Sequence, residues 1–125
     1  MIKLLLIGSG GFIGSVGRYL VSRGMQSLFM ELSLPIGTLS VNVIGCLLAG
    51  LLGGLLETRF TLTSEMQLFF FVGILGGFTT FSAFGYETYN LLRTTHPLVA
   101  GANMLAQIGL GIGAVCLGHW LARIF

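Results

Sequence analysis

Long apolar stretches, separated by short polar connections, run along the whole chain. The clearest cover 32–56, 66–86 and 94–122, and a weaker one at 4–21 is interrupted by Arg18. A helix takes about 20 residues to cross a hydrocarbon core of about 30 Å, so each stretch is long enough to span a membrane. We therefore predict a single all-α membrane domain over residues 1–125. Its four transmembrane helices are expected at about 3–23, 36–56, 65–93 and 98–123.

The third predicted span contains a segment that disfavours a continuous helix. Residues 76–84, GGFTTFSAF, lie within a run that has no charged residue between Glu65 and Glu87. The two glycines accept backbone conformations that other residues resist, and β-branched Thr79 and Thr80 weaken a helix further. We predict a break here that exposes main-chain carbonyl oxygens, which suit a small hard cation. The alternative interpretation is a packing kink beneath a crossing helix.

Two phenylalanines follow this segment and lie on one helix face. Phe81 and Phe84 are three residues apart, a spacing that places their side chains together on a helix. Apolar packing is the ordinary interpretation of such a pair. The ring edges, however, carry the positive end of the aromatic quadrupole, so they could contact a small anion and release it easily. Ser82, between them, adds a hydroxyl donor on another face.

A few polar and charged side chains interrupt the other spans. Asn42 in the second span is expensive in lipid, so it either bonds a neighbouring helix or lines a polar path together with Thr38, four residues earlier. Glu87 and Arg18 are candidates for a functional role because they are ionisable within spans, although either could instead reach the membrane surface. In the fourth span, Asn103 and Gln107 are expected to form one polar stripe.

The glycines favour close helix packing over a nucleotide-binding loop. Gly8, Gly11 and Gly14 follow a short apolar run as in a dinucleotide-binding motif, but no alternation of strands and helices follows them. Small residues four apart on one face let membrane helices approach closely. We expect one such pair at a helix interface in each span: Gly10/Gly14, Gly50/Gly54, Gly73/Gly77 and Gly109/Gly113.

The composition agrees with a membrane protein and gives no sign of nucleic-acid binding or catalysis. Only 8% of the residues are charged and 54% are hydrophobic, whereas soluble domains carry about 25% charged residues. The net charge of +2 is small and dispersed, so no basic patch is expected. No nucleophile and base stand at a spacing that suits catalysis, and we expect no enzymatic activity.

The basic residues are balanced across the predicted membrane. With an even number of spans, both termini lie on one side, and Lys/Arg bias in short loops normally sets the orientation. Because the bias is almost absent, the chain could insert in both orientations and form an antiparallel dimer. A fixed topology with few basic residues is the alternative. One side carries Lys3, Arg59 and Arg123, and the other carries Arg23 and Arg93, with Arg18 slightly inside the first span.

With these features the chain strongly resembles the Fluc (CrcB-like) family of fluoride channels. The similarity covers the glycine-rich first span, the GTLSVNVIGC stretch with Asn42, and the GGFTTFSAF motif. It implies a fluoride-selective channel in a prokaryotic inner (plasma) membrane, which lets fluoride leave the cell passively and so reduces its toxicity. It also implies a dual-topology antiparallel homodimer, in contact with membrane lipid, with paired fluoride pores.

The resemblance further implies roles for individual residues. A structural sodium ion is expected at the centre of the dimer, held by the main-chain carbonyls of Gly76 and Thr79. The implied fluoride pore residues are Phe81, Phe84, Asn42, Ser82, Thr38, Glu87 and Arg18.

Three positions depart from the family pattern. Ala83 replaces a threonine often found between the phenylalanines, Asn103 stands where some relatives have a tyrosine, and Gly111 stands where a serine occurs. These departures leave open the fourth-span side of the pore and the possibility of pairing with a paralogous partner. The alternative function is a small dual-topology proton-coupled multidrug exporter. That class needs a carboxylate deep in its first span, where this chain has Arg18 and no acid.

Overall fold

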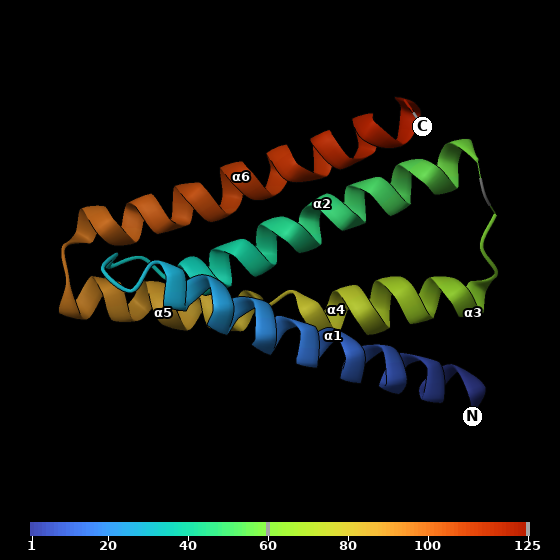
Figure 1. Cartoon of the computed structure of the whole chain (residues 1–125), viewed down its shortest axis with the longest axis horizontal. Helices are drawn as coiled ribbons and strands as arrows, with labels where there is room; N and C mark the ends of the chain where they lie inside the picture. The colour runs from blue at the N-terminus through green and yellow to red at the C-terminus, as the bar shows by residue number, and fades with distance from the viewer. Residues whose placement is uncertain (60, 125) are drawn as a thin grey trace.

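The computed structural model describes residues 1–59 and 61–124, and all regular structure in these residues is helical. Four helical stretches are long and apolar enough to cross a membrane: Ile2–Leu28, Ile36–Thr58, Ser64–Thr94 and Pro97–Ile124. The chain is therefore a multi-pass membrane protein, and the prediction of four spans is confirmed. The elements are α1 (Ile2–Leu28), α2 (Ile36–Thr58), α3 (Ser64–Gln67), η1 (Leu68–Leu75), α4 (Gly76–Phe78), α5 (Phe81–Thr94) and α6 (Pro97–Ile124) (Figure 1).

The first span is longer than predicted. The helix α1 continues to Leu28, past the predicted end of the span near residue 23. Neither Arg23 nor Gly24 stops the helix, and Gln26 remains helical while its Oε1 accepts a hydrogen bond from the Gly37 N–H at 3.0 Å. That bond satisfies one of the free N–H groups in the first turn of α2, so the last turn of α1 helps to position the second span.

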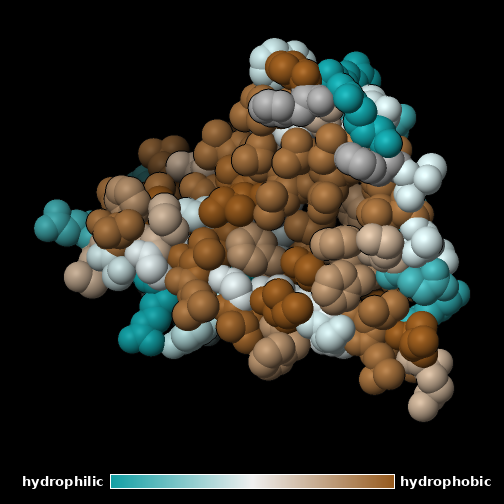
Figure 2. Space-filling view, turned by 45° about the vertical axis from the view of Figure 1, so that its right-hand side comes forward, coloured by the Kyte–Doolittle hydropathy of each residue, from teal (hydrophilic) through white to brown (hydrophobic). Residues whose placement is uncertain are grey.

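The helices alternate in direction, and both termini lie at the same end of the bundle (Figure 1). α2 packs mainly along α6, whereas α1 crosses the third span and packs on η1 and α4. Most large apolar side chains face outward, including Phe12 and Leu105, which are 70% and 76% exposed. Figure 2 shows that hydrophobic residues cover the middle of one face and that hydrophilic residues gather toward its edges. Such a surface suits contact with lipid.

Glycines form the closest contacts between helices, as three of the four predicted pairs require. A Cβ atom on Gly14 would lie 2.2 Å from the Ile74 carbonyl oxygen, and one on Gly50 would lie 2.1 Å from that of Val115. The prediction for Gly109/Gly113 was wrong among the described residues, because a Cβ on either glycine meets none of their atoms within 4 Å. On α6 the close approach to α2 occurs instead at Gly118, which lies on a different face of the helix. A Cβ there would meet the Leu47 carbonyl oxygen at 2.2 Å.

The third span is broken at the middle, as predicted, but the threonines form the break and the glycines do not. Thr79 and Thr80 are extended, with φ/ψ of −79°/157° and −150°/113°. Gly76 is helical at −63°/−37°, so its conformation needs no glycine. Gly77 serves packing, because a Cβ there would lie 2.6 Å from the Gly11 carbonyl oxygen of α1. The glycines therefore let α1 cross closely, and the chain opens immediately after that crossing.

Candidate ion pathway

The Asn42 side chain pairs with the main chain at the break. Its Oδ1 accepts a hydrogen bond from the Thr80 N–H at 2.9 Å, and its Nδ2 donates to the Thr80 carbonyl at 3.1 Å. A break in a membrane helix exposes main-chain groups that water cannot satisfy, and each would otherwise cost several kcal/mol. Asn42 thus replaces the helical hydrogen bond that the Thr80 N–H loses and donates a further bond to the Thr80 carbonyl. Asn42 therefore bonds a neighbouring helix, which is one of its two predicted roles, and its predicted role in a polar path stays a prediction.

The ends of the two half-helices are also closed by side chains. The Thr80 Oγ1 accepts a hydrogen bond from the Ala83 N–H at 3.2 Å and so caps the start of α5. The Leu75 carbonyl accepts from both the N–H and the hydroxyl of Thr79, each at 2.9 Å. Because the Thr80 N–H bonds Asn42, it does not continue the helical ladder to the Gly76 carbonyl. The Gly76 oxygen is thereby released from its usual helical partner.

A cavity of about 460 Å³ lies beside this break. The two predicted cation-binding residues, the aromatic pair and two amides converge on it. Phe81 and Phe84 have ring centroids 5.4 Å apart and ring planes at 63°, so the two rings pack edge to face with each other. Phe81 is 83% exposed in the single chain, so this side of the cavity opens to the exterior of the protomer. The cavity is lined in part by Asn42, Gly76, Thr79, Phe81, Phe84 and Gln107.

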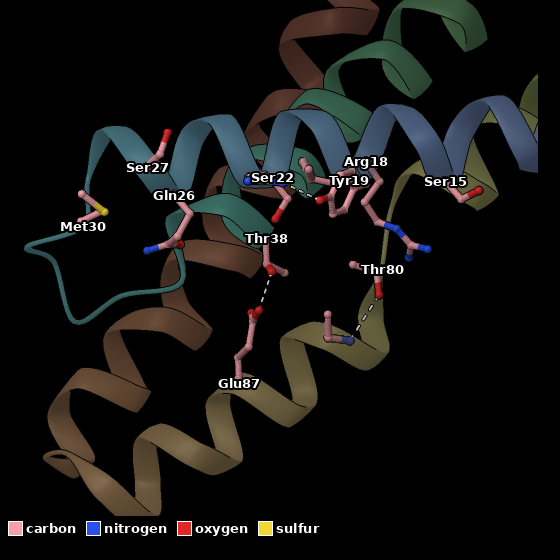
Figure 3. A pocket seen from close by; sticks show the side chains of 13 residues that line it. Ser15, Arg18, Tyr19, Ser22, Gln26, Ser27, Met30, Thr38, Thr80 and Glu87 are labelled. Carbon is pink, nitrogen blue, oxygen red and sulfur yellow. Dashed lines mark hydrogen bonds between the residues drawn. The ribbon is translucent and has the colours of Figure 1, made fainter.

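A second, larger cavity of about 670 Å³ lies between α1, the start of α2 and α5 (Figure 3). Arg18, Thr38 and Glu87 line it, together with Thr80. The Thr38 hydroxyl donates a hydrogen bond to the Glu87 Oε1 at 2.7 Å, which joins α2 to α5 across the cavity. The other carboxylate oxygen, Oε2, is buried and has no hydrogen-bond partner among the described residues. Polar side chains line part of this cavity, and Arg18 places a cation at its wall.

The structure assembles most of the predicted site residues into these two cavities. Thr80 lines both cavities, and the Asn42 amide, which bonds Thr80, lines the smaller one. Ser82 is the exception: its side chain is exposed, and its hydroxyl lies 3.2 Å from that of Thr80. The structure does not bring Ser82 to either cavity, and its predicted role in the pore stays a prediction.

The fourth span contributes two buried amides that sequence reasoning placed on one stripe without assigning them to the site. Asn103 is 1% exposed and its Nδ2 donates to the Thr88 hydroxyl at 2.8 Å. Gln107 is 9% exposed and its Oε1 accepts from the Asn42 Nδ2 at 3.0 Å. Gly111, also buried, packs near the Cys46 sulfur. The four-residue spacing of polar side chains in an apolar span was the available signal that Gln107 faces the break.

Comparison with known proteins assigns the chain to one family. Residues 5–119 match the family described as CrcB-like protein, Camphor Resistance (CrcB). The chain is 44% identical over 124 residues to the fluoride-specific ion channel FluC of Maridesulfovibrio salexigens, covering 99% of this chain and 98% of the relative. It is 40% identical over 121 residues to the fluoride-specific ion channel FluC 1 of Nitrobacter hamburgensis, covering 97% and 95% of the two chains.

A third relative, the fluoride-specific ion channel FluC of Methylobacillus flagellatus, is 37% identical over 124 residues, covering 99% of this chain and 97% of the relative. These matches extend over nearly the full length of both proteins. They therefore include the broken third span, the crossing first span and the amide-bearing spans on either side of the cavity. The chain belongs to the CrcB-like family of membrane proteins.

Proposed function

We propose that this protein is a fluoride-selective ion channel that mediates passive efflux of fluoride and so reduces its toxicity in the cytoplasm. The observation that carries the proposal is the cavity at the break of the third span, where an edge-to-face phenylalanine pair lies beside hydrogen-bonding amides. Its relatives over nearly the full length are named fluoride-specific ion channels. Hydrogen fluoride enters a cell from an acidic medium and dissociates inside, and a channel for the trapped anion lets it leave down its gradient.

The two cavities suggest an order for the path of the anion. Arg18 at the wall of the larger cavity attracts anions by its charge, which is most effective within a low-dielectric surround. Thr38 and Glu87 line the same cavity. The ring edges of Phe81 and Phe84 then contact the anion weakly enough to release it. Ser82 remains a proposed hydroxyl donor to this path.

We propose a structural sodium ion held by the main-chain carbonyl oxygens of Gly76 and Thr79. The donor set supports this, because uncharged oxygens are suitable ligands for a small hard cation. The Thr80 N–H bonds Asn42 and so leaves the Gly76 carbonyl without its helical partner. The positive charge of the ion would attract carbonyl oxygens from two copies of the broken span and so hold the two copies together.

We further propose that the chain acts as an antiparallel, dual-topology homodimer in a prokaryotic inner membrane. Basic residues at the two ends of the bundle are almost balanced, which permits insertion in both orientations. Phe81, 83% exposed in a single chain, needs a neighbour to enclose the site. Gly109 and Gly113 have open space around them and are available to a second chain.

Fluoride efflux from liposomes tests the proposed function. Purified protein is reconstituted in liposomes loaded with potassium fluoride, and efflux is followed with a fluoride electrode after valinomycin is added. The proposal predicts rapid fluoride efflux, little efflux from chloride-loaded liposomes, and no dependence on a proton gradient. Exchange of a cationic drug for protons without fluoride efflux would support the multidrug exporter in its place.

A further inference from the structure

Two tyrosine–arginine pairs lie at the same end of the bundle. Tyr19 and Arg23 are four residues apart near the end of α1, and Tyr89 and Arg93 have the same spacing near the end of α5. The guanidinium carbon of Arg23 lies 5.9 Å from the centre of the Tyr19 ring, and that of Arg93 lies 5.7 Å from the centre of the Tyr89 ring. Because α1 and α5 end on the same side of the bundle (Figure 1), the two pairs lie at the same membrane surface.

Each tyrosine holds its arginine in place. A cation is attracted to the face of an aromatic ring when it lies within about 6 Å of the ring centre, and both contacts meet that distance. Arg23 also donates a hydrogen bond from Nη1 to the Tyr19 hydroxyl at 2.7 Å. Both arginines are exposed, and within residues 1–59 and 61–124 neither forms an ion pair with a carboxylate. Most of the five N–H donors of each guanidinium therefore have no partner in the described part of the chain.

The lengths of the helices place the pairs at the level of the lipid headgroups. The 27 residues of α1 extend over about 40 Å at about 1.5 Å per residue, whereas the hydrocarbon core is about 30 Å thick. The ends of α1 therefore reach beyond the hydrocarbon, and Arg93 is the last residue but one of α5. Tyrosine rings favour this interfacial level because they are amphipathic. Tyr19 and Tyr89 are 58% and 54% exposed, as contact with lipid requires.

The chemistry of the pairs fits one class of ligand. A guanidinium presents a planar fork of N–H donors that matches a phosphate group, and anionic phospholipids combine a phosphate with a net negative charge. Leu20 and Leu92, each next to a member of a pair, are exposed and offer an apolar surface to acyl chains. The connection 29–35 also carries an acid, Glu31. Attraction of an anionic lipid therefore depends on the two held guanidinium groups and not on the total charge at this end.

We propose that Arg23 and Arg93 bind the headgroup phosphates of anionic phospholipids, and that Tyr19 and Tyr89 are positioning residues that hold the two guanidinium groups at the level of the headgroups. No pair of this kind occurs at the opposite end of the bundle among the described residues. Tyr19 and Arg23 also line part of the larger cavity, so a lipid bound there would border the candidate ion pathway. The inference does not rest on the proposed channel function.

Lipid binding to the purified protein in a neutral detergent tests the proposal. The probes are phosphatidylglycerol and zwitterionic phosphatidylcholine with the same acyl chains, and native mass spectrometry gives the apparent Kd of each lipid. We expect the wild type to bind phosphatidylglycerol more tightly than phosphatidylcholine. In Arg23→Gln/Arg93→Gln the affinity for phosphatidylglycerol should fall by at least about fivefold, the usual effect of removing one basic residue near an anionic surface. Lys3→Gln/Arg123→Gln removes the same charge from the opposite end, and this matched control should bind as the wild type does.

Substitutions of the tyrosines separate positioning from charge. Tyr19→Leu/Tyr89→Leu keeps both arginines but removes the rings, and we expect binding of phosphatidylglycerol to weaken by about two- to fivefold. Tyr19→Trp/Tyr89→Trp should bind as the wild type does, because tryptophan presents the ring face that a cation prefers most. If the glutamine variant fails to elute as the wild type does, Arg23→Lys/Arg93→Lys takes its place. Lysine keeps the charge and loses the planar fork, so weaker binding than in the wild type is expected.

Three results would overturn the proposal. Equal affinity of the wild type for the two lipids would show that no anionic headgroup is recognised. Equal losses in the arginine variant and in the matched control would show that total charge, and not the paired arginines, attracts the lipid. Displacement of phosphatidylglycerol by an equal concentration of inorganic phosphate at constant ionic strength would show a site for a soluble anion in place of a lipid. None of these results involves fluoride efflux, so the channel function stands or falls separately.

Discussion

At the scale of single residues, the break in the third span depends on side chains that take over main-chain hydrogen bonds. Asn42 pairs with the Thr80 peptide from another helix, and the Thr80 hydroxyl caps the half-helix that follows. These bonds matter more in a membrane than in water because no solvent is present to replace them. An extended segment at this depth is therefore stable only with these partners.

Removing the cap should weaken the second half-helix. In Thr80→Ala the Ala83 N–H loses its acceptor, which we expect to destabilise the protein by about 0.5–2 kcal/mol. The measurement is the thermal unfolding midpoint in detergent, followed by circular dichroism. Thr80→Ser keeps the hydroxyl and serves as the control. If alanine and serine have the same midpoint, the cap contributes nothing to the fold.

The hydrogen bond between Thr38 and Glu87 should contribute a similar amount to the free energy of unfolding. Thr38→Val preserves the shape of a side chain that is 5% exposed and removes the only hydrogen bond that the Glu87 carboxylate accepts among the described residues. Leaving a buried polar group without a partner costs about 1–3 kcal/mol. We expect a lower unfolding midpoint for Thr38→Val and a midpoint near that of the wild type for Thr38→Ser. Identical midpoints for all three proteins would contradict the role of this bond.

At the scale of elements, glycines allow α1 to cross closely over the third span, and the third span breaks immediately after this crossing. The segment before the break, η1, is a π-helix over eight residues, and π-helical turns are rare and often occur at functional sites. Its wider turns change which residues face α1 compared with an ordinary helix. Gly73 and Gly77 both face α1 in this arrangement, and the chain leaves the helix after Phe78.

The crossing can be tested by one added methyl group. In Gly14→Ala the new Cβ would lie 2.2 Å from the Ile74 carbonyl oxygen, so two main chains would have to separate. We expect a destabilisation of at least about 1–3 kcal/mol, the usual cost of overpacking, with aggregation on size-exclusion chromatography in detergent. Gly8→Ala on the same helix meets nothing within 4 Å and is the matched control. A wild-type elution profile and midpoint for Gly14→Ala would show that the crossing is looser than described.

The sequence predicts the features that depend on neighbouring residues, but it does not predict those that depend on contacts between distant residues. Hydropathy predicts the spans, and the composition of residues 76–84 predicts a break, because both depend on neighbouring residues. The exact position of the break also involves Asn42, which bonds Thr80 from 38 residues away, so neighbouring residues alone do not predict it. The glycine spacing on α6 was similarly ambiguous: Gly109/Gly113 and Gly118 fit the same pattern, and only packing against α2 selects Gly118. The orientation of Gln107 depends on a contact with Asn42, 65 residues away.

At the scale of the whole molecule, the balance of charge between the two ends of the bundle bears on assembly. Lys/Arg residues in short loops set the orientation of a membrane protein. A nearly even balance leaves both orientations accessible, and an antiparallel dimer needs both. Orientation and activity should therefore be coupled if the proposed antiparallel dimer is the active form.

Added lysines should test this coupling. Ser33→Lys/Thr95→Lys adds charge at one end of the bundle, and Ile2→Lys/Thr61→Lys adds it at the other, because these residues lie in or beside the connections at opposite ends. Each variant expressed alone should insert in one orientation and give cells little protection from fluoride. Co-expression of the two should restore protection. Labelling of an introduced terminal cysteine in whole cells measures orientation, and full protection by either variant alone would contradict the antiparallel dimer.

The central claim is that the ring edges of Phe81 and Phe84, beside the break in the third span, contact the permeating anion. The most direct test is fluoride-electrode efflux from liposomes containing the wild type, Phe81→Ile or Phe84→Ile, with folding checked by size-exclusion chromatography. Isoleucine preserves apolar packing and removes the positive ring edge. We predict rapid fluoride efflux for the wild type and a loss of at least about tenfold, about 1.4 kcal/mol in barrier height, for each variant. Unchanged efflux in both variants would contradict the account.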